Sequence, residues 1–270
     1  MTNQARAEAR DAAVRIATAA TLLVAVDFDG TLAPTVDDPA TARALPLASD
    51  AVGTLAQLPS TTVALVSGRH LAGLQAVVRV PPEVILVGSH GAESLVEGKE
   101  SGPTLTAEET ALLGTLCRTV EDVASRFAGA RVERKPSGCG LHTRLSSPAD
   151  AELARIAALA AVRALTGSAS IAQRYGKDIL EFTVRAADKG KALEWLRELT
   201  AASAVLFIGD DVTDEDGFRV LEAGDVGIKV GTGETAAQFR ISDPAEVSEL
   251  LAELVTVRKR ALSDAGGGAD

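Results

Sequence analysis

The stretch Leu22-Leu23-Val24-Ala25-Val26-Asp27-Phe28-Asp29-Gly30-Thr31 decides the fold. Its first half is a short, continuous apolar run, which is typical of a strand covered on both faces. Two carboxylates and a glycine follow at once. The run therefore predicts a buried strand that delivers Asp27 and Asp29 to its carboxyl end, where the chain turns.

Three further apolar runs alternate with stretches of helical composition. The runs are Thr62–Val66, Val84–Val87 and Ala204–Ile208, and the helical stretches include Leu47–Leu58 and Lys189–Thr200. This alternation predicts an α/β fold with a doubly wound parallel sheet and crossover helices. Every run ends in polar residues or glycine. Because the ligand site of an open parallel sheet lies at the carboxyl ends of its strands, we expect these ends to converge on one site.

The middle of the chain has a different pattern, in which a helix is followed by two strands, twice over. The predicted helices are Ala107–Phe127 and Ala149–Leu165, and the predicted strands are Ala130–Lys135, Leu141–Leu145, Ser168–Arg174 and Asp178–Val184. This repeat suits a small α+β domain with helices on one face of its sheet. We expect residues 96–185 to be a lid domain inserted into a core domain of residues 1–95 and 186–262. The tail, residues 263–270, is predicted to be disordered.

Composition and charge argue against several classes of function. The 27 Lys and Arg against 37 Asp and Glu give a net charge of -10, which disfavours nucleic acid and anionic membranes as partners. No apolar stretch reaches the roughly 20 residues of a membrane-spanning helix. The two cysteines, Cys117 and Cys139, belong to no zinc-type cluster, so the cytoplasm is the expected compartment. The oligomeric state is left open.

The acid pair after the first strand fits phosphoryl transfer. A carboxylate is already an anionic oxygen nucleophile at neutral pH, so Asp27 needs no base to activate it. Asp29 can then protonate the leaving alkoxide and later take a proton from the attacking water. The alternative is an ordinary glycine turn after a strand, in which Asp is a common residue.

A second acidic segment, Gly209-Asp210-Asp211-Val212-Thr213-Asp214-Glu215-Asp216, follows the strand near residue 208. Crowded carboxylates need a cation, and hard oxygen ligands suit Mg²⁺. We expect Asp27 and Asp210 to bind the metal through their side chains and Asp29 through its backbone carbonyl. Asp214, or with less support Asp211, is expected at or just behind the metal. Some of these acids, Glu215 and Asp216 above all, fit a helix N-terminus equally well.

Two further pieces complete a phosphate site. Ser67-Gly68-Arg69 ends the second predicted strand, where a hydroxyl and backbone N–H groups can cradle a phosphate. Lys189 begins a predicted helix and can offset the charge of the phosphate and of the nucleophile. By itself, each piece is equally consistent with a turn or with a solvated lysine.

The four pieces in this order resemble the haloacid dehalogenase-like superfamily of phosphotransferases, over roughly residues 20–95 and 186–260. The resemblance implies Asp27 as nucleophile, Asp29 as acid and base, and Ser67 and Lys189 as phosphate contacts. It also implies Mg²⁺ on Asp210 and Asp214. Because position 29 is an acid, the pattern resembles that of the phosphatases and mutases of the superfamily rather than that of its dehalogenases or ion pumps.

A closer resemblance, to the trehalose-6-phosphate phosphatase family, extends into the lid. It is carried by Gly88–Glu93, Glu133–Lys135, Leu141–Arg144, Gly176–Glu181 and Gly209–Asp216. It implies that lid residues contact the sugar hydroxyls, with residues of the Gly88–Glu93 segment and of the second lid strand nearby. These residues are Glu133, Lys135, Lys177 and Glu181, with His90, Gly91, His142 and Arg144.

The spacing of the lid residues agrees with this role. Glu133 and Lys135 are two residues apart, as are His142 and Arg144, so each pair is expected on one side of the lid sheet. Charged donors and acceptors of both signs suit a disaccharide. Exposed cross-strand ion pairs are the alternative. The glycine- and proline-rich segment Lys135–Gly140 gives the lid hairpin a shape of its own.

The resulting prediction is a magnesium-dependent phosphatase that hydrolyses trehalose 6-phosphate in trehalose biosynthesis. The first alternative is a related phosphatase acting on sucrose 6-phosphate or a glycosyl-glycerate phosphate, because the core motifs do not separate these substrates. The second is a non-catalytic regulatory partner of a sugar-phosphate synthase. Retention of Asp27, Asp29, Lys189 and Asp210 argues against the second.

Overall fold

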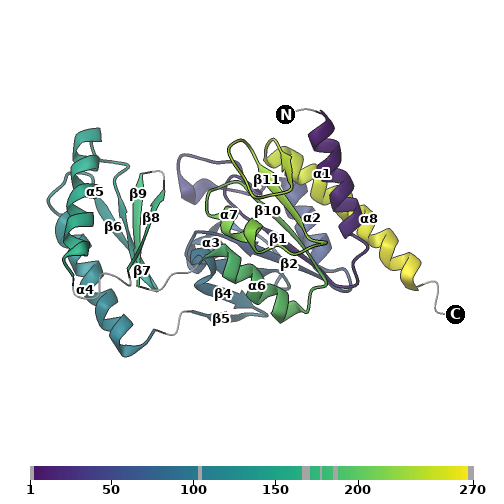
Figure 1. Cartoon of the computed structure of the whole chain (residues 1–270), viewed down its shortest axis with the longest axis horizontal. Coiled ribbons are helices and arrows are strands. Elements are labelled where there is room, and N and C mark those ends of the chain that lie inside the picture. Colours follow the sequence, from purple (N-terminus) through teal and green to yellow (C-terminus); the bar gives the residue numbers. More distant parts are fainter. Residues whose placement is uncertain (1–2, 103–104, 166–170, 177, 185–187, 267–270) are drawn as a thin grey trace. The chain divides into compact units, whose positions relative to one another are not determined.

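The chain divides into two compact units. The computed structural model describes residues 3–102, 105–165, 171–176, 178–184 and 188–266, and the statements below concern these residues (Figure 1). The large unit is Met1–Ser101 with Ala187–Asp270, and the small unit is Gly102–Ala186. The sequence placed the first change of unit about six residues earlier, at 95/96, whereas the strand at Lys99–Ser101 pairs with the large sheet.

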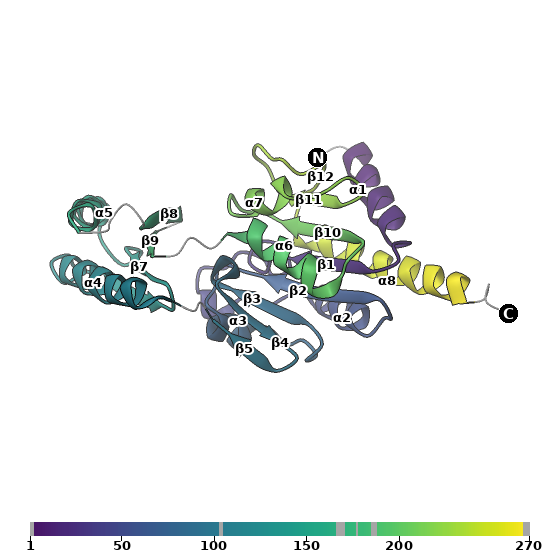
Figure 2. The ribbon, with the colours of Figure 1, turned by 60° about the horizontal axis from the view of Figure 1, so that its bottom comes forward.

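An eight-stranded sheet forms the centre of the large unit (Figure 2). Its order is β12 (Phe239–Ile241), β11 (Val226–Val230), β10 (Ala204–Gly209), β1 (Leu22–Val26), β2 (Thr61–Val66), β3 (Ile85–Gly88), β4 (Glu93–Val96) and β5 (Lys99–Ser101). Strands β12 to β3 are parallel, and β4 and β5 are antiparallel additions at one edge. The chain winds outward from β1 in both directions, so the switch point of the sheet lies between β1 and β10.

Helices cover both faces of this sheet, which confirms the doubly wound α/β prediction. One face carries α1 (Asn3–Ile16), α2 (Pro46–Ala56), α3 (Leu71–Val77) and α8 (Pro244–Gly266), and the other carries α6 (Lys189–Thr200) and α7 (Asp214–Arg219). Two 3-10 turns, η1 (Pro39–Thr41) and η2 (Ser89–Gly91), lie in the connections. Alternate residues of β1 serve the two cores: Val24 packs under α1, α2 and α8, and Leu23 packs under α6. No helix in the described part of the chain combines the length and apolarity needed to cross a bilayer.

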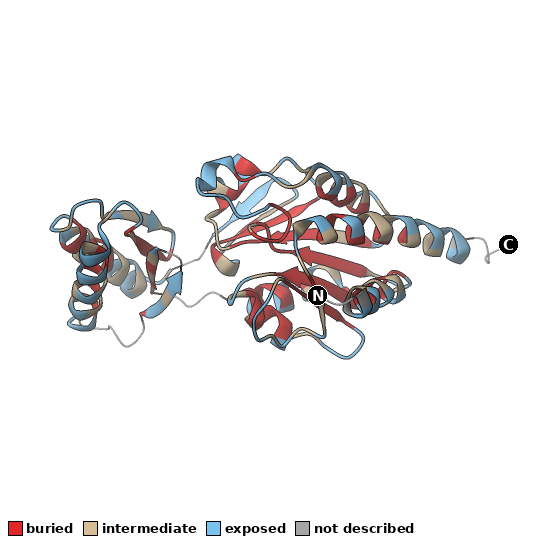
Figure 3. Cartoon of the chain, turned by 90° about the horizontal axis from the view of Figure 1, so that it is seen from above, coloured by how far each residue is buried: buried red, intermediate tan, exposed pale blue. Residues whose placement is uncertain are grey.

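The small unit is an antiparallel sheet with two helices. Its elements are α4 (Ala107–Ala124), β6 (Arg131–Lys135), β7 (Gly138–His142), α5 (Pro148–Arg163), β8 (Ala172–Gly176) and β9 (Ile179–Thr183), and the strand order is β6-β7-β9-β8. Residues from α4 and α5 form one apolar cluster with alternate residues of the sheet, such as Leu141, Leu180 and Phe182. Figure 3 shows buried residues gathered where the helices meet the strands. The opposite sheet face therefore carries the polar residues.

Two sequence predictions need correction. The second lid strand is Gly138–His142 rather than Leu141–Leu145, because Thr143 to Ser146 form a turn closed by a Ser146 N to Thr143 O hydrogen bond. The glycines that suggested a loop are required inside the strand, since a Cβ at Gly138 would lie 2.1 Å from the Phe182 carbonyl oxygen. The tail predicted to be disordered from Ser263 is helical through Gly266, while residues 267–270 lie outside the described residues.

Candidate active site

Three carboxylates meet at the carboxyl ends of the two central strands. Asp27 follows β1 and Asp210 follows β10, whose ends are in register because Val26 pairs with Ile208. Asp214 is the first residue of α7, one turn further along the chain. One carboxylate oxygen from each of the three acids lies within 4.8 Å of the others. The convergence predicted from the sequence is thus present for these three residues.

Two glycines make this approach possible. Gly30 has φ +82°, and a Cβ there would lie 2.1 Å from Asp210 Oδ2. A Cβ at Gly209 would lie 2.2 Å from Asp214 Cγ. Only glycine leaves room at these positions for the carboxylates, so the turns after β1 and β10 have a direct role in shaping the site.

Lys189 lies between two of the acids. Asp188 caps the N-terminus of α6 by accepting a 2.8 Å hydrogen bond from Lys191 N, which places Lys189 in the first turn. The buried ammonium donates to Asp27 Oδ1 at 2.6 Å and to Asp214 Oδ1 at 2.7 Å. Burial alone would lower the pKa of Lys189, but the charges of Asp214 and Asp27 outweigh it and raise that pKa. Lys189 therefore stays a cation in this buried position.

The acids respond to burial in the opposite way. Burial raises the pKa of Asp27 well above its usual range, and the neighbouring Asp214 and Asp210 add to this, while Lys189 opposes it. The pKa of Asp210 is raised to about 6, first by burial and then by Asp214. Three carboxylates thus share one ammonium, an arrangement in which a further cation is strongly favoured.

The donor set fits a divalent cation. Three carboxylate groups offer the hard oxygen ligands that Mg²⁺ prefers. Asp211, the other acid considered for the metal, has an exposed side chain outside this group of three. Its backbone N–H donates to Asp214 Oδ2 at 2.9 Å and so orients the carboxylate of Asp214. This geometry favours Asp214 over Asp211 as a side-chain ligand.

Asp29 and Arg69 form a bidentate ion pair. Arg69 Nε and Nη2 donate to the two carboxylate oxygens of Asp29, each at 2.6 Å. The guanidinium also lies over the Phe28 ring, 5.6 Å from its centroid. Arg69, predicted to contact phosphate, is therefore engaged by the predicted acid and base.

The predicted phosphate cradle and the segment containing His90 are joined by hydrogen bonds. Ser67, buried at the end of β2, accepts a bond from Arg69 N through its Oγ at 3.2 Å. Its carbonyl accepts from His90 N at 3.0 Å, and the His90 ring lies against Gly68, where a Cβ would be 2.6 Å from it. Gly91 follows with φ +111°. The sequence-predicted residues at the ends of β2 and β3 thus lie side by side.

In the small unit, four predicted sugar contacts lie on one sheet face. Cross-strand register places Glu133, Lys135, His142 and Glu181 together, opposite the face that packs on the helices. His142 Nε2 lies 2.8 Å from Glu133 Oε2, and Lys135 pairs with Glu181. Arg144 lies in the turn after β7, so the prediction that Arg144 and His142 share one side of a strand is wrong. Lys177 lies outside the described residues.

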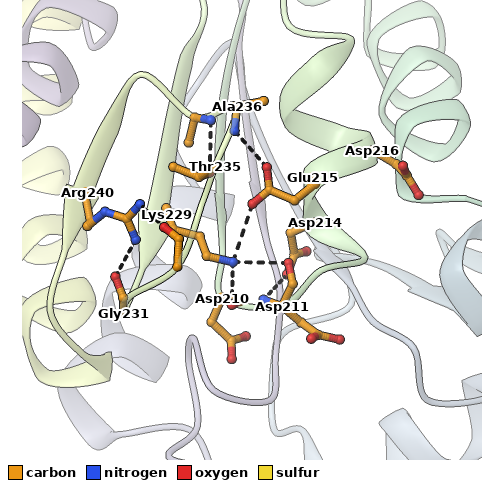
Figure 4. A network of polar contacts seen from close by, with 12 residues as sticks. Asp210, Asp211, Asp214, Glu215, Asp216, Lys229, Gly231, Thr235, Ala236 and Arg240 are labelled. Atoms are coloured by element: carbon orange, nitrogen blue, oxygen red, sulfur yellow. Dashed lines mark hydrogen bonds and ion pairs between the residues drawn. The ribbon is translucent and has the colours of Figure 1, made fainter. Parts of the chain in front are cut away.

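Lys229, a buried lysine of β11 beside the loop of Asp210 and Asp211, was not among the residues predicted from the sequence (Figure 4). Its Nζ donates to the carbonyl oxygens of Asp210 at 2.6 Å and Asp211 at 3.2 Å. A signal was available, because the apolar run Val226-Gly227-Ile228-Lys229-Val230 contains a single charge in a strand buried along its length. Glu93 was also missed; its carboxylate accepts from Ser89 Oγ and from Leu71 N, which ties the His90 segment to α3.

Comparison with known protein families identifies the family of this chain. A family model described as trehalose-phosphatase matches residues 25–245, which span the small unit and most of the large unit. The chain belongs to the trehalose-phosphatase family. Its sheet and its acid cluster also fit the wider haloacid dehalogenase-like superfamily, as the sequence motifs indicated.

The chain is also similar to individual mycobacterial proteins and to solved structures. A trehalose-phosphate phosphatase of Mycobacterium avium is 32% identical over 249 residues, which are 87% of this chain and 62% of that protein. An uncharacterized glycosyl hydrolase of Mycobacterium tuberculosis is 36% identical over 247 residues, 86% of this chain but 18% of that protein. The chain thus spans less than two thirds of the length of these relatives. The crystal structure of a trehalose-6-phosphate phosphatase related protein superposes with a TM-score of 0.70 at 27% identity, covering 88% of this chain and 99% of that one.

Proposed function

We propose that this chain hydrolyses trehalose 6-phosphate to trehalose and inorganic phosphate through an aspartyl-phosphate intermediate, as a step of trehalose biosynthesis. The observation that carries the proposal is the buried carboxylate of Asp27, held 2.6 Å from Lys189 beside Asp210 and Asp214. Family membership supports the choice of reaction. The names of relatives support the choice of sugar.

The chain's own residues divide the chemistry as follows. A carboxylate oxygen of Asp27 attacks phosphorus while the bond from phosphorus to the ester oxygen breaks, and the leaving alkoxide takes a proton from Asp29. Asp29 then removes a proton from the water that attacks the phosphoryl group, which regenerates Asp27 and releases phosphate. Lys189 offsets negative charge on the nucleophile and the phosphoryl group throughout. Ser67 and the neighbouring backbone N–H groups cradle the phosphate.

Asp27, Asp210 and Asp214 are the residues that would hold Mg²⁺, with the Asp29 carbonyl as a further ligand. When bound, the ion supplies positive charge to the phosphoryl oxygens. Without it, Lys189 is the one cation among the described residues that contacts the side chains of this carboxylate group, and it contacts those of Asp27 and Asp214. The chemistry of the donor set therefore supports a magnesium-dependent enzyme.

Arg69 has a second task beside phosphate binding in this proposal. Its guanidinium occupies both oxygens of Asp29. A substrate phosphate competes for the same guanidinium, and its arrival frees Asp29 to act on the leaving group. The ion pair therefore keeps the acid and base ordered before substrate binds.

The small unit is proposed as the lid that recognises the sugar. The pairs Glu133 with His142 and Lys135 with Glu181 present hydrogen-bond donors and acceptors on one sheet face, and a sugar hydroxyl can replace one partner of such a pair. Lys177, Arg144 and His90 with Gly91 are expected to add contacts. The proposed compartment is the cytoplasm, because Cys117 and Cys139 are buried free cysteines and thiols stay reduced there.

Phosphate release from a panel of sugar phosphates tests the function. With Mg²⁺ present, the wild-type protein should prefer trehalose 6-phosphate to sucrose 6-phosphate, glucose 6-phosphate and glucosylglycerate phosphate. Asp27→Asn serves as the control for contaminating phosphatases. Equal rates on all sugar phosphates would refute the substrate assignment and leave only the assignment as a phosphatase. Absence of turnover on every phosphate ester would favour a regulatory partner of a synthase.

A further inference from the structure

A lysine inside the sheet of the large unit has no role in the reaction described above. Lys229 is only 4% exposed, and every residue of β11 is buried. Placing an ammonium in such a position costs free energy unless its hydrogen bonds are restored by partners. The identity of those partners therefore indicates what the residue does.

The partners of Lys229 are backbone carbonyl groups of the loop after β10, which contains Asp210 and Asp211. Its Nζ donates to Asp210 O at 2.6 Å and to Asp211 O at 3.2 Å, and Glu215 Oε1 lies 3.5 Å away. Figure 4 shows the carboxylate of Asp210 pointing away from Lys229 while its carbonyl points toward the ammonium. Lys229 thus binds the loop without occupying the carboxylate proposed to bind the metal.

Glu215 extends the same connection. It is buried next to Asp214 in the first turn of α7, and its Oε2 accepts from Ala236 N at 2.8 Å. The loop before β12 and the start of α7 are therefore joined through Glu215, and Lys229 joins both to the loop after β10 (Figure 4). These connections fix Asp210 and Asp214 relative to each other.

The two buried lysines of the large unit consequently differ in kind. Lys189 contacts the carboxylates of Asp27 and Asp214 directly. Lys229 contacts backbone carbonyls behind Asp210. A cation on the carbonyls opposes the mutual repulsion of the carboxylates and holds the loop in one shape, and it does not itself occupy the carboxylate oxygens of Asp210.

We propose that Lys229 is a positioning residue for the divalent metal, which it serves by fixing the loop of Asp210 and Asp211. The inference rests on the proposed function, because it takes Asp210 as a metal ligand. A purely charge-balancing lysine would have the opposite effect, since removing its charge would strengthen the attraction of the acids for a cation. The sign of the change in Mg²⁺ affinity separates the two roles.

The test compares Lys229→Met with Lys259→Met, an exposed lysine of α8 that changes the net charge equally. Mg²⁺ binding is measured by titration calorimetry, well below the unfolding temperature of each protein. Loss of a group that orients metal ligands typically weakens binding about 10- to 100-fold, and Lys229→Met should fall in that range while Lys259→Met stays at the wild-type value. The Mg²⁺ concentration for half-maximal phosphatase activity should rise by the same factor, with kcat largely restored at saturating Mg²⁺.

Other outcomes overturn the inference. Unchanged or tighter Mg²⁺ binding by Lys229→Met means that the lysine balances charge only. A lower kcat at every Mg²⁺ concentration, with unchanged half-saturation, means that it serves only folding. Lys229→Arg covers the case in which the Met variant does not fold, because it keeps the charge and changes the donor geometry, and wild-type affinity in it contradicts positioning. Failure of the wild type to bind Mg²⁺ refutes the proposed metal instead.

Discussion

The charged groups around Asp27 in the large unit and the ion pairs on the polar sheet face of the small unit differ in burial. In the large unit the side chains of Lys189, Asp27 and Asp214 are 2%, 6% and 0% exposed. In the small unit the side chains of Lys135 and Glu181 are 10% and 14% exposed, and those of His142 and Glu133 are 24% and 33% exposed. The first set is buried, and the side chains of the second set are partly exposed to water.

This difference matches two kinds of work. Charges in a buried site interact strongly because water does not screen them, which suits a nucleophile and its counter-ion. Partly exposed pairs exchange partners with little cost, which suits recognition of a sugar whose hydroxyls compete with water. Variants of the first set should therefore affect the hydrolysis of every substrate, and variants of the second should affect one substrate.

The largest expected effect sharpens the first half of this comparison. Asp27→Asn keeps the shape of the side chain but removes the anionic nucleophile, so kcat should fall by roughly 10³-fold or more. The loss should be the same for trehalose 6-phosphate and for a small aryl phosphate, as stopped assays of phosphate release would measure. Circular dichroism should show a wild-type fold. Near-normal turnover in this variant would rule out the covalent mechanism.

Lys189→Met tests the cost of breaking the buried set. Asp27 and Asp214 would lose their shared cation in a dry environment, so the free energy of unfolding in EDTA should fall by about 3–5 kcal/mol. The matched change in the small unit, Lys135→Met, removes one member of a pair that keeps some contact with water, and it should cost less, about 1–3 kcal/mol. Urea unfolding of both variants measures the difference. Equal costs would contradict the distinction between the two units.

The substrate distinction is tested by Glu181→Gln, which keeps the size of the side chain and removes its charge. A hydrogen bond to a charged group is worth about 1.5–3 kcal/mol, so kcat/KM for trehalose 6-phosphate should fall about 10- to 150-fold. The aryl phosphate should be hydrolysed as by wild type. A parallel loss on both substrates would assign Glu181 to the fold of the small unit rather than to recognition. Lys177→Ala, at the remaining predicted contact, should behave in the same way.

The sequence located the buried central strands of the large sheet better than β7 of the small sheet, for a physical reason. Strands buried on both faces read as uninterrupted apolar runs, so β1 and β10 were located to within a residue. In β7, Gly138 and Gly140 read as a loop, although tight packing against β9 requires glycine there. The consequence was the misplacement of Arg144 on a strand.

The same reasoning explains which site residues were found. Asp27, Asp29 and Asp210 directly follow apolar runs, so their placement at the sheet edge follows from strand direction alone. The Arg69 to Asp29 pair and the contact of Lys229 with the carbonyls of Asp210 and Asp211 each join groups from two neighbouring strands of the sheet. The single charge within Val226–Val230 marks Lys229 as unusual, but the pattern of one strand does not identify its partners, which only the folded sheet reveals.

The smallest expected effect concerns metal and pH, and it separates the units within one molecule. The pKa of Asp210 is raised to about 6 in the folded chain, so ionising this group costs stability. In EDTA, the contribution of protonated Asp210 is complete below the unfolded pKa near 4 and is lost as the pH rises through about 6, so the free energy of unfolding should decline over this range. Excess Mg²⁺ binds the ionised form and should offset the decline, adding about 2.7 kcal/mol at 100 times its dissociation constant.

Hydrogen exchange at pH 7.5 should show the added protection in the loops around Asp27 and Asp210, and no direct protection on the sheet face of Glu133 and Glu181. Stabilisation by Mg²⁺ that is as large at pH 4.5 as at pH 7.5 would show that the ion binds elsewhere than on these carboxylates.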